Sequence, residues 1–288
     1  MDSIKVKAMA KINLGLDVLN RREDGYHNVR MIMQSVNLYD TIFIKKTESE
    51  GISIQTNLSY LPTNQNNLVY KAAKLLIDEF ELSDGLKIIL EKHIPVAAGM
   101  AGGSSDAAAT LVGMNKLFGL NLSKKELMQR GVSLGADIPF CLMRGTALSE
   151  GIGEVLTPLP HPPKCHVLIA KPDISVSTKY VYDNLKLNEK TKHPNIDSLI
   201  AGLALSDLHK IAANLGNVLE DVTVTKYPII KEIKDFMLTN GALGSLMSGS
   251  GPTVFGLYED LEIAKSAKRA LIYSGLAKDI ILTGCFIH

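Results

Sequence analysis

The chain has 288 residues, which is enough for two domains of ordinary size. Its 31 basic and 30 acidic side chains leave a formal net charge of +1, so the basic excess typical of nucleic-acid-binding proteins is absent. The sequence has no run of about 20 apolar residues that would span a bilayer, and its 3 cysteines form no C-x-x-C pair. We therefore expect a cytoplasmic protein without a disulfide framework or metal site, which binds neither nucleic acid nor membrane.

The first half of the sequence predicts strands followed by helices. Apolar and polar residues alternate from Ile4 to Ala10, which is the pattern of a half-buried strand. The motif Ser123-x-x-Glu126 is a capping box and predicts the start of a helix that ends near residue 135. Further helices are predicted over residues 67–80 and 104–118, and further strands over residues 14–19, 31–37, 41–46, 52–56, 86–90 and 140–148.

Four prolines between residues 158 and 163 indicate a linker. We place the domain boundary there, which gives domains 1–157 and 158–288. The second half again mixes both kinds of element, so the fold class is α+β, and the last strand is expected to return to the first domain. Its helices are predicted over residues 177–184, 228–239 and 261–274, and its strands over residues 167–170, 243–247, 254–258 and 280–286.

A glycine-rich loop, residues 95–106, joins a predicted strand to the helix at 104–118. Glycine lets a backbone approach a ligand closely, and free N–H groups at a helix start favour an anion such as phosphate. The loop is neither a Walker A motif nor a dinucleotide fingerprint. On glycine content alone, a tight turn with Ser104 as N-cap has equal weight. The small residues Ala107–Ala109 favour the phosphate interpretation, because they let the helix pack closely beneath the loop.

Other candidate residues carry charge or sit in turns. Lys11 and Asn13 lie two residues apart and so share one strand face, and Asp137 follows the end of a predicted helix. A carboxylate with a nearby lysine suits phosphoryl transfer to a hydroxyl group. Taken singly, an exposed strand lysine and a turn or N-cap aspartate before Pro139 are the better interpretations. The segment Gly249-Ser-Gly-Pro252 is either a second anion-binding turn or a tight connection between strands.

Together these segments resemble the GHMP kinases over essentially the whole chain. The matching motifs are Ala10-Lys-Ile-Asn-Leu14, Asp24-Gly-Tyr-His27, residues 94–106, Gly135-Ala-Asp-Ile-Pro139 and residues 246–252. The first two point to a member that acts on a cytidine diphosphate-linked methylerythritol. The resemblance implies an N-terminal ATP domain like ribosomal protein S5 domain 2 and a ferredoxin-like C-terminal substrate domain. It also implies ATP-dependent phosphorylation of a 2-hydroxyl group in isoprenoid precursor synthesis, with Mg²⁺, by a monomer or weak homodimer.

The resemblance also assigns roles to individual residues. Lys11 and Asp137 match the catalytic pair, as electrostatic partner and general base. Asn67 and Lys92 match nucleotide-side positions. The ATP phosphate loop is expected to comprise Pro95, Val96, Ala97, Ala98, Gly99, Met100, Ala101, Gly102, Gly103, Ser104 and Ser105. The substrate is expected to contact Asn13, Tyr26, His27, Ile152, Thr178, Tyr182, Gly249, Ser250 and Gly251.

The sequence departs from the family pattern within the loop. Ala97, Ala98 and Ala101 stand where relatives often have glycine, so we expect a negative φ at all three. Two alternatives stay open. One is another GHMP kinase, which acts on homoserine, mevalonate or a sugar, and the other is a non-catalytic nucleotide-binding regulator.

Overall fold

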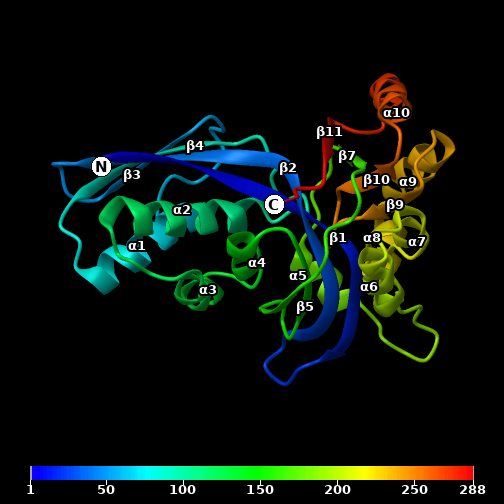
Figure 1. Ribbon diagram of the computed structural model, residues 1–288, viewed down its shortest axis with the longest axis horizontal. Coiled ribbons are helices and arrows are strands. Elements are labelled where there is room, and N and C mark those ends of the chain that lie inside the picture. The colour runs from blue at the N-terminus through cyan, green and yellow to red at the C-terminus, as the bar shows by residue number, and fades with distance from the viewer. Residues whose placement is uncertain (1, 288) are drawn as a thin grey trace. The chain divides into compact units, whose positions relative to one another are not determined.

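Two long strands open the chain in the computed structural model, which describes residues 2–287 (Figure 1). They are β1 (Ser3–Arg21) and β2 (His27–Thr47), and each is continuous where the sequence predicted two shorter strands. Unit 1 comprises the chain up to Ala10, Leu38–Val96 and Ala101–Arg144, and unit 2 comprises the other segments, including the chain from Gly145. The contiguous division into 1–157 and 158–288 stays a prediction.

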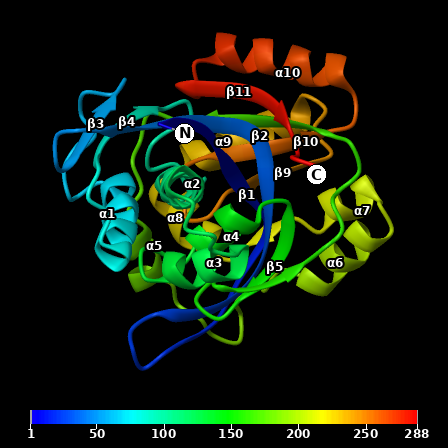
Figure 2. The same cartoon turned by 60° about the vertical axis from the view of Figure 1, so that its left-hand side comes forward.

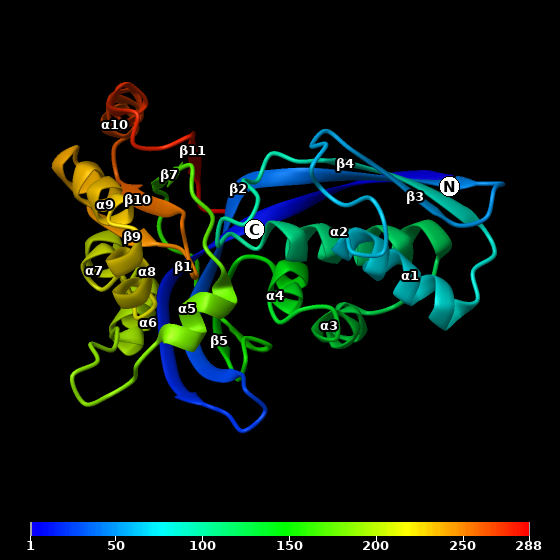
Figure 3. The same cartoon turned by 180° about the vertical axis from the view of Figure 1, so that it is seen from behind.

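Unit 1 packs helices on one face of a sheet. Strand β3 (Ile52–Thr56) pairs in parallel with β4 (Gly85–Glu91), and α1 (Leu68–Phe80) connects them. Strand β4 pairs antiparallel with the second half of β2. Figures 1 and 3 both show α1 and α2 (Gly102–Phe118) along the same face of these strands. The elements predicted here are confirmed.

Small residues let α2 lie close to this sheet. Ala107, Ala108 and Ala109 are buried in the core with Ile44 and other strand residues. A Cβ atom on Gly113 would lie 2.7 Å from the Cδ1 atom of Ile44. The close packing expected from the alanine run is therefore confirmed, and it fixes the helix whose first turn follows the glycine loop.

Two short helices complete unit 1. The predicted capping box is present at the start of α3 (Lys124–Val132). The strand predicted over residues 140–148 is wrong in its first part, because α4 (Ile138–Met143) occupies residues 140–143 and β5 (Thr146–Glu150) begins later. Proline in the first turn is compatible with a helix, since the first-turn N–H groups have no intrahelical acceptor. An apolar run this short does not distinguish a strand from a buried helix.

The second sheet belongs to unit 2 and has the ferredoxin-like order. Its strands are antiparallel neighbours in the order β11-β7-β10-β9. Helix α9 (Ile229–Thr239) precedes β9, and α10 (Leu261–Ser274) joins β10 to β11 and lies beside β11 in Figure 2. The four strands are β7 (His166–Lys171), β9 (Gly244–Met247), β10 (Val254–Tyr258) and β11 (Asp279–Gly284). This arrangement confirms the expected fold class.

The chain end extends beyond this sheet. Strand β11 pairs with β7, and directly after it Cys285 forms a single bridge with Val36 of β2. The buried thiols of Cys165 and Cys285 are 3.8 Å apart, and Cys141 is buried as well.

Unit 2 also contains elements that the sequence did not predict. Strand β6 (Val155–Pro158) pairs with β5, which pairs with the first half of β2, and β8 (Gly216–Asn217) runs parallel to β1. The helices are α5 (Thr178–Asn184), which was predicted, and α6 (Ile196–Ala204), α7 (Leu208–Ala213) and α8 (Glu220–Lys226), which were not. Within residues 2–287, no helix combines the length and the apolar character needed to cross a membrane.

Candidate functional site

The glycine loop leads into a helix whose start has no side-chain cap. Ala101 is the N-cap of α2, and no side chain accepts a hydrogen bond from the first turn. The amide of Ser105 makes the first bond of the helix, to the carbonyl of Ala101. Among residues 2–287 we find no acceptor for the amides of Gly102, Gly103 and Ser104. The alternative with Ser104 as N-cap is therefore wrong, and three amides at the positive end of the helix are available to an anion.

Two loop alanines adopt the backbone conformation that favours glycine. Ala97 has φ 51° and Ala101 has φ 54°, so the expected negative φ is wrong at both positions. Of the three loop alanines, only Ala98 keeps the expected backbone. A left-handed conformation costs a residue other than glycine about 1–2 kcal/mol. The cost is offset where the surrounding contacts fix the loop.

The middle of the loop, residues 97–100, belongs to unit 2 and is anchored there from two sides. The amide of Lys11 donates to the carbonyl of Met100 at 3.1 Å. The hydroxyl of Ser248 donates to the carbonyl of Gly99 at 2.9 Å. Gly99 has φ 70°, and a Cβ atom on it would lie 2.2 Å from the carbonyl oxygen of Ser248. Only glycine fits this contact without displacing the backbone.

The segment Gly249–Gly251 forms the turn between β9 and β10, which we call the glycine turn. Two backbone hydrogen bonds close the turn: the amide of Ser248 donates to the carbonyl of Thr253, and that of Gly251 donates to the carbonyl of Ser248. Within residues 2–287, no protein acceptor is found for the amides of Gly249 and Ser250. Two successive free amides in a turn with a left-handed residue, here Gly249 at φ 57°, are typical of an anion-binding concavity.

Lys11 and Asn13 lie on one face of β1, as predicted. Lys11 is only 5% exposed, so the alternative of an exposed strand lysine is wrong. Its Nζ atom donates to the Oδ1 atom of Asn13 at 2.7 Å. Asn13 is fully buried, and its Nδ2 atom donates to the sulfur of Met31 at 3.3 Å. Lys11 is thus held in place by its strand neighbour.

Asp137 belongs to unit 1, at the N-cap of α4. Its side chain does not cap the helix, and it is half-buried. The alternative in which Asp137 serves as a capping residue is therefore not supported. Its role as general base, and its pairing with Lys11, stay predictions.

Several residues predicted to contact the substrate lie together in unit 2. The rings of His27 and Tyr182 are 5.1 Å apart at an interplanar angle of 39°. The hydroxyls of Thr178 and Ser250 are 2.9 Å apart, which links α5 to the glycine turn. Burial is the main cause that lowers the pKa of His27, so its imidazole is neutral at pH 7. A neutral imidazole offers one donor and one acceptor.

Two further predicted substrate residues lie in connections between strands of unit 2. Tyr26 directly precedes β2, and its ring is largely exposed. Ile152 lies in the turn between β5 and β6, and its neighbour Gly151 accepts a hydrogen bond from the amide of Val29. Ile152 is thus placed beside β2.

Lys92 lies in a buried ion cluster that the sequence did not reveal. Its Nζ atom donates to Asp106 at 2.7 Å and also to Asp40, and all three side chains are almost fully buried. Burial alone would lower the pKa of Lys92, but the ion pairs with Asp106 and Asp40 outweigh burial and raise it. The cluster joins the end of β4 to the first turns of α2. The charge of Lys92 is thus already paired within unit 1.

The two acids of the cluster differ in their environment. Asp40 also accepts hydrogen bonds from the amides of His93 and Ile94, at 2.5 and 2.8 Å. Asp106 has a buried Oδ1 atom for which residues 2–287 provide no hydrogen-bond partner. Burial is the main cause that raises the pKa of Asp106 to about 8. The carboxyl group of Asp106 therefore keeps its proton to a higher pH in the folded chain than in the unfolded chain.

Asn67, the second predicted nucleotide-side residue, uses its side chain as a helix cap. Its Oδ1 atom accepts from the amide of Val69 at 2.9 Å, and its Nδ2 atom donates to the carbonyl of Pro62 at 2.7 Å. Within residues 2–287, no group of three or more His, Cys, Asp or Glu side chains is arranged to hold a metal ion.

Two family models match the chain. The model of the GHMP kinase N-terminal domain matches residues 67–145, and that of the GHMP kinase C-terminal domain matches residues 196–276. The chain is 58% identical to a 4-diphosphocytidyl-2-C-methyl-D-erythritol kinase of Lachnoclostridium phytofermentans, over 99% of this chain and 98% of that protein. It is 54% identical to the enzyme of the same name from Lachnospira eligens, over 99% of both chains.

Solved structures show the same similarity. The crystal structure of a 4-(cytidine 5'-diphospho)-2C-methyl-D-erythritol kinase is similar with a TM-score of 0.85 and 32% identity, over 99% of this chain and 100% of that one. A homoserine kinase from Cytophaga hutchinsonii is similar with a TM-score of 0.81 but 23% identity, over 98% of this chain and 95% of that one. The second similarity shows the fold alone.

The close contact at Gly99 predicts a large effect of one methyl group. Gly99→Ala should lower the free energy of unfolding by more than the ~1–2 kcal/mol that a left-handed alanine costs, because the carbonyl of Ser248 must also move. Gly275→Ala is the matched control: Gly275 has φ 68° in the same unit, and nothing lies within 4 Å of an added Cβ. Urea unfolding of both variants measures the difference. Equal losses would contradict the contact.

The buried carboxyl of Asp106 predicts that stability depends on pH. Between its usual pKa of 3.8 and about 8, the folded state keeps a proton that the unfolded state has lost. Stability contributed by this group is therefore lost as pH rises through that window. Asp106→Asn cannot titrate, so its unfolding temperature should fall less than that of the wild type between pH 5 and pH 8. Parallel curves for the two proteins would show that Asp106 does not hold the proton.

Proposed function

Because the chain belongs to the GHMP kinase family, and within it to the 4-diphosphocytidyl-2-C-methyl-D-erythritol kinases, we propose that it phosphorylates 4-diphosphocytidyl-2-C-methyl-D-erythritol. The γ-phosphoryl group of ATP is transferred to the 2-hydroxyl group of that substrate, and ADP is released. The reaction serves the synthesis of isoprenoid precursors through the non-mevalonate (methylerythritol phosphate) route. We place this activity in the cytoplasm and expect a monomer or weak homodimer.

The observation that carries the proposal is the uncapped first turn of α2. The amides of Gly102, Gly103 and Ser104 lack acceptors among residues 2–287, and they sit at the positive end of a 17-residue helix. Such a helix start binds the phosphates of a nucleotide. ATP phosphates are therefore assigned to this turn and to the loop that precedes it. Mg²⁺ usually binds through nucleotide phosphates and one or two carboxylates, so we propose that it arrives as the Mg–ATP complex.

The proposed chemistry uses one carboxylate and one ammonium group of the chain. The carboxylate of Asp137 takes the proton of the attacking hydroxyl group, and the ammonium group of Lys11 stabilises negative charge on the transferred phosphoryl group. Both roles come from the matching family motifs. The hydrogen bond from Lys11 to Asn13 supports the role of Lys11, because it fixes the ammonium group before substrate binds.

The proposed substrate end recognises the cytosine base and the diphosphate. The ring of Tyr182 gives the base an aromatic face, and stacking of this kind contributes about 1–3 kcal/mol. The neutral imidazole of His27, 5.1 Å from that ring, can read the polar edge of the base. The free amides of Gly249 and Ser250 are assigned to the diphosphate. Tyr26, Ile152 and Thr178 are retained as proposed lining residues.

The proposed reaction predicts one new phosphorus signal. With Mg–ATP and 4-diphosphocytidyl-2-C-methyl-D-erythritol, ³¹P NMR should show a phosphomonoester that grows in step with ADP, while the substrate's diphosphate signals persist. Coupling to the carbon skeleton should place the new group at the 2-hydroxyl. Formation of ADP with inorganic phosphate alone would instead indicate hydrolysis of ATP.

The proposed catalytic pair predicts losses of turnover without loss of nucleotide binding. Asp137→Asn should lower kcat by about 10²–10⁴-fold, because it removes a general base. Lys11→Ala should lower kcat by about 10²–10³-fold, because it removes charge stabilisation in the transition state. ATP affinity, measured by titration calorimetry, should change little in both variants.

Asp173→Asn is the control for these variants, since Asp173 forms an exposed ion pair with Lys278. It should retain wild-type turnover. Near wild-type kcat in Asp137→Asn would remove Asp137 from the mechanism.

A further inference from the structure

The glycine turn has no side chain of its own that could hold its two free amides in position. Gly249 and Gly251 lack side chains, and the hydroxyl of Ser250 is paired with Thr178. The positions of the amides therefore depend on what the carbonyls and amides around them bind. An anion site of this kind works only if its N–H groups converge before the ligand arrives.

Asn217 makes three hydrogen bonds that fix this backbone. Its Nδ2 atom donates to the carbonyls of Met247 and Gly249, at 2.9 and 2.8 Å. Its Oδ1 atom accepts from the amide of Leu219 at 3.0 Å. The side chain is buried, and these partners determine which end of its amide faces the turn. Asn217 also pairs in register with Leu16 of β1, so the residue that holds the turn is itself fixed by the pairing of β8 with β1.

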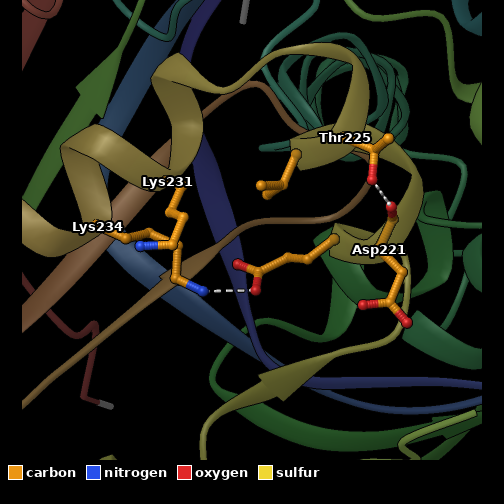
Figure 4. A pocket seen from close by; sticks show the side chains of 6 residues that line it. Asp221, Thr225, Lys231 and Lys234 are labelled. Carbon is orange, nitrogen blue, oxygen red and sulfur yellow. Dashed lines mark hydrogen bonds and ion pairs between the residues drawn. The ribbon is translucent and has the colours of Figure 1, made fainter.

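Glu220 fixes the strand residue just before the turn. Its Oε1 atom accepts from the amide of Met247 at 2.8 Å, and its Oε2 atom accepts from Lys234 of α9 at 2.5 Å. Lys234 is labelled in Figure 4, together with Asp221 and Thr225 of α8. One turn further along α8, the hydroxyl of Thr223 donates to the carbonyl of Ser250 at 3.3 Å. The segment 217–223 thus contacts the turn on both of its sides.

The hydrogen bonds of residues 247–251 show which backbone groups of the glycine turn stay available to a ligand. The amide of Met247 is bound by Glu220, and the carbonyls of Met247 and Gly249 are bound by Asn217. In the described chain, the amides of Gly249 and Ser250 are the ones left for a ligand. Because Asn217 takes up the carbonyl of Gly249, that carbonyl does not face an incoming anion.

We propose that Asn217 and Glu220 are positioning residues that hold the amides of Gly249 and Ser250 for a phosphate group of a bound nucleotide. The inference rests on the proposed function, because it takes the ligand to be a nucleoside diphosphate or triphosphate. Neither residue touches the ligand. Each acts through the backbone of the glycine turn, so the loss of either should weaken recognition of phosphate and leave recognition of the nucleoside intact.

The test compares each nucleoside with its diphosphate by titration calorimetry: cytidine with cytidine 5'-diphosphate, and adenosine with ADP. In Asn217→Ala, the affinity for one of the diphosphates should fall about tenfold, while the affinity for the matching nucleoside stays unchanged. A loss in the cytidine pair identifies the substrate as the source of the phosphate, and a loss in the adenosine pair identifies ATP. Equal losses for nucleoside and diphosphate, or no loss, would overturn the proposal.

A second pair of variants keeps the test decisive if Asn217→Ala does not fold. Glu220→Ala should show the same selective loss, and Glu220→Gln should restore most of it, because a glutamine oxygen still accepts from the amide of Met247. Lys231→Met is the control, since Lys231 lines the same pocket as Glu220 (Figure 4) but pairs with Asp235 on its own helix. The proposal would be overturned if Glu220→Gln did not restore the affinity for the diphosphate, or if Lys231→Met lost as much of that affinity as Glu220→Ala.

The same measurements distinguish a failure of the proposed function from a failure of this inference. If the wild type binds neither diphosphate better than its nucleoside, both are overturned. If the wild type prefers a diphosphate and the variants keep that preference, only the role of Asn217 and Glu220 is overturned.

Discussion

The contact between Gly99 and Ser248 is the constraint on which the site in unit 2 depends. Two backbone segments, about 150 positions apart in the chain, approach so closely that a Cβ atom on Gly99 would lie 2.2 Å from the carbonyl oxygen of Ser248. The Ser248 hydroxyl closes the contact with a hydrogen bond to the carbonyl of Gly99 at 2.9 Å. This contact places the middle of the glycine loop against the glycine turn. It also offsets the left-handed conformation of Ala97, which the sequence did not lead us to expect.

The surrounding structure supplies rigidity from different sources in the two units. In unit 1, the alanines of α2 let the helix pack closely on its sheet, and the buried cluster of Lys92, Asp40 and Asp106 joins the helix to β4. In unit 2, hydrogen bonds from the uncharged side chains of Asn217 and Ser248 hold the backbone of the glycine turn and of the glycine loop in place. In each unit, the surrounding groups are hydrogen-bonded within the protein, and a few backbone amides stay available to a ligand. That is what an anion site requires when it is to bind without rearranging.

Local patterns in the sequence predicted most elements, because strand alternation, helix stripes and the capping box at Ser123 are local signals. They failed at residues 140–148, where a short apolar run after Pro139 is equally compatible with helix and strand. The candidate motifs were found through local spacing and the family resemblance. Asp40 and Asn217 were missed, because their partners lie 52 and about 30 positions away and neither belongs to a motif. Long-range hydrogen bonds of this kind leave no periodic trace in a sequence.

The central claim is that the chain is a kinase specific for a cytidine diphosphate-linked alcohol. Release of ADP from Mg–ATP, measured separately with 4-diphosphocytidyl-2-C-methyl-D-erythritol, homoserine, mevalonate and galactose, tests it most directly. We expect turnover with the cytidyl substrate alone. Turnover with one of the other alcohols would contradict the substrate assignment while keeping the ATP site. Binding of ATP without turnover of any alcohol would contradict the assignment as a kinase and favour a nucleotide-binding regulator.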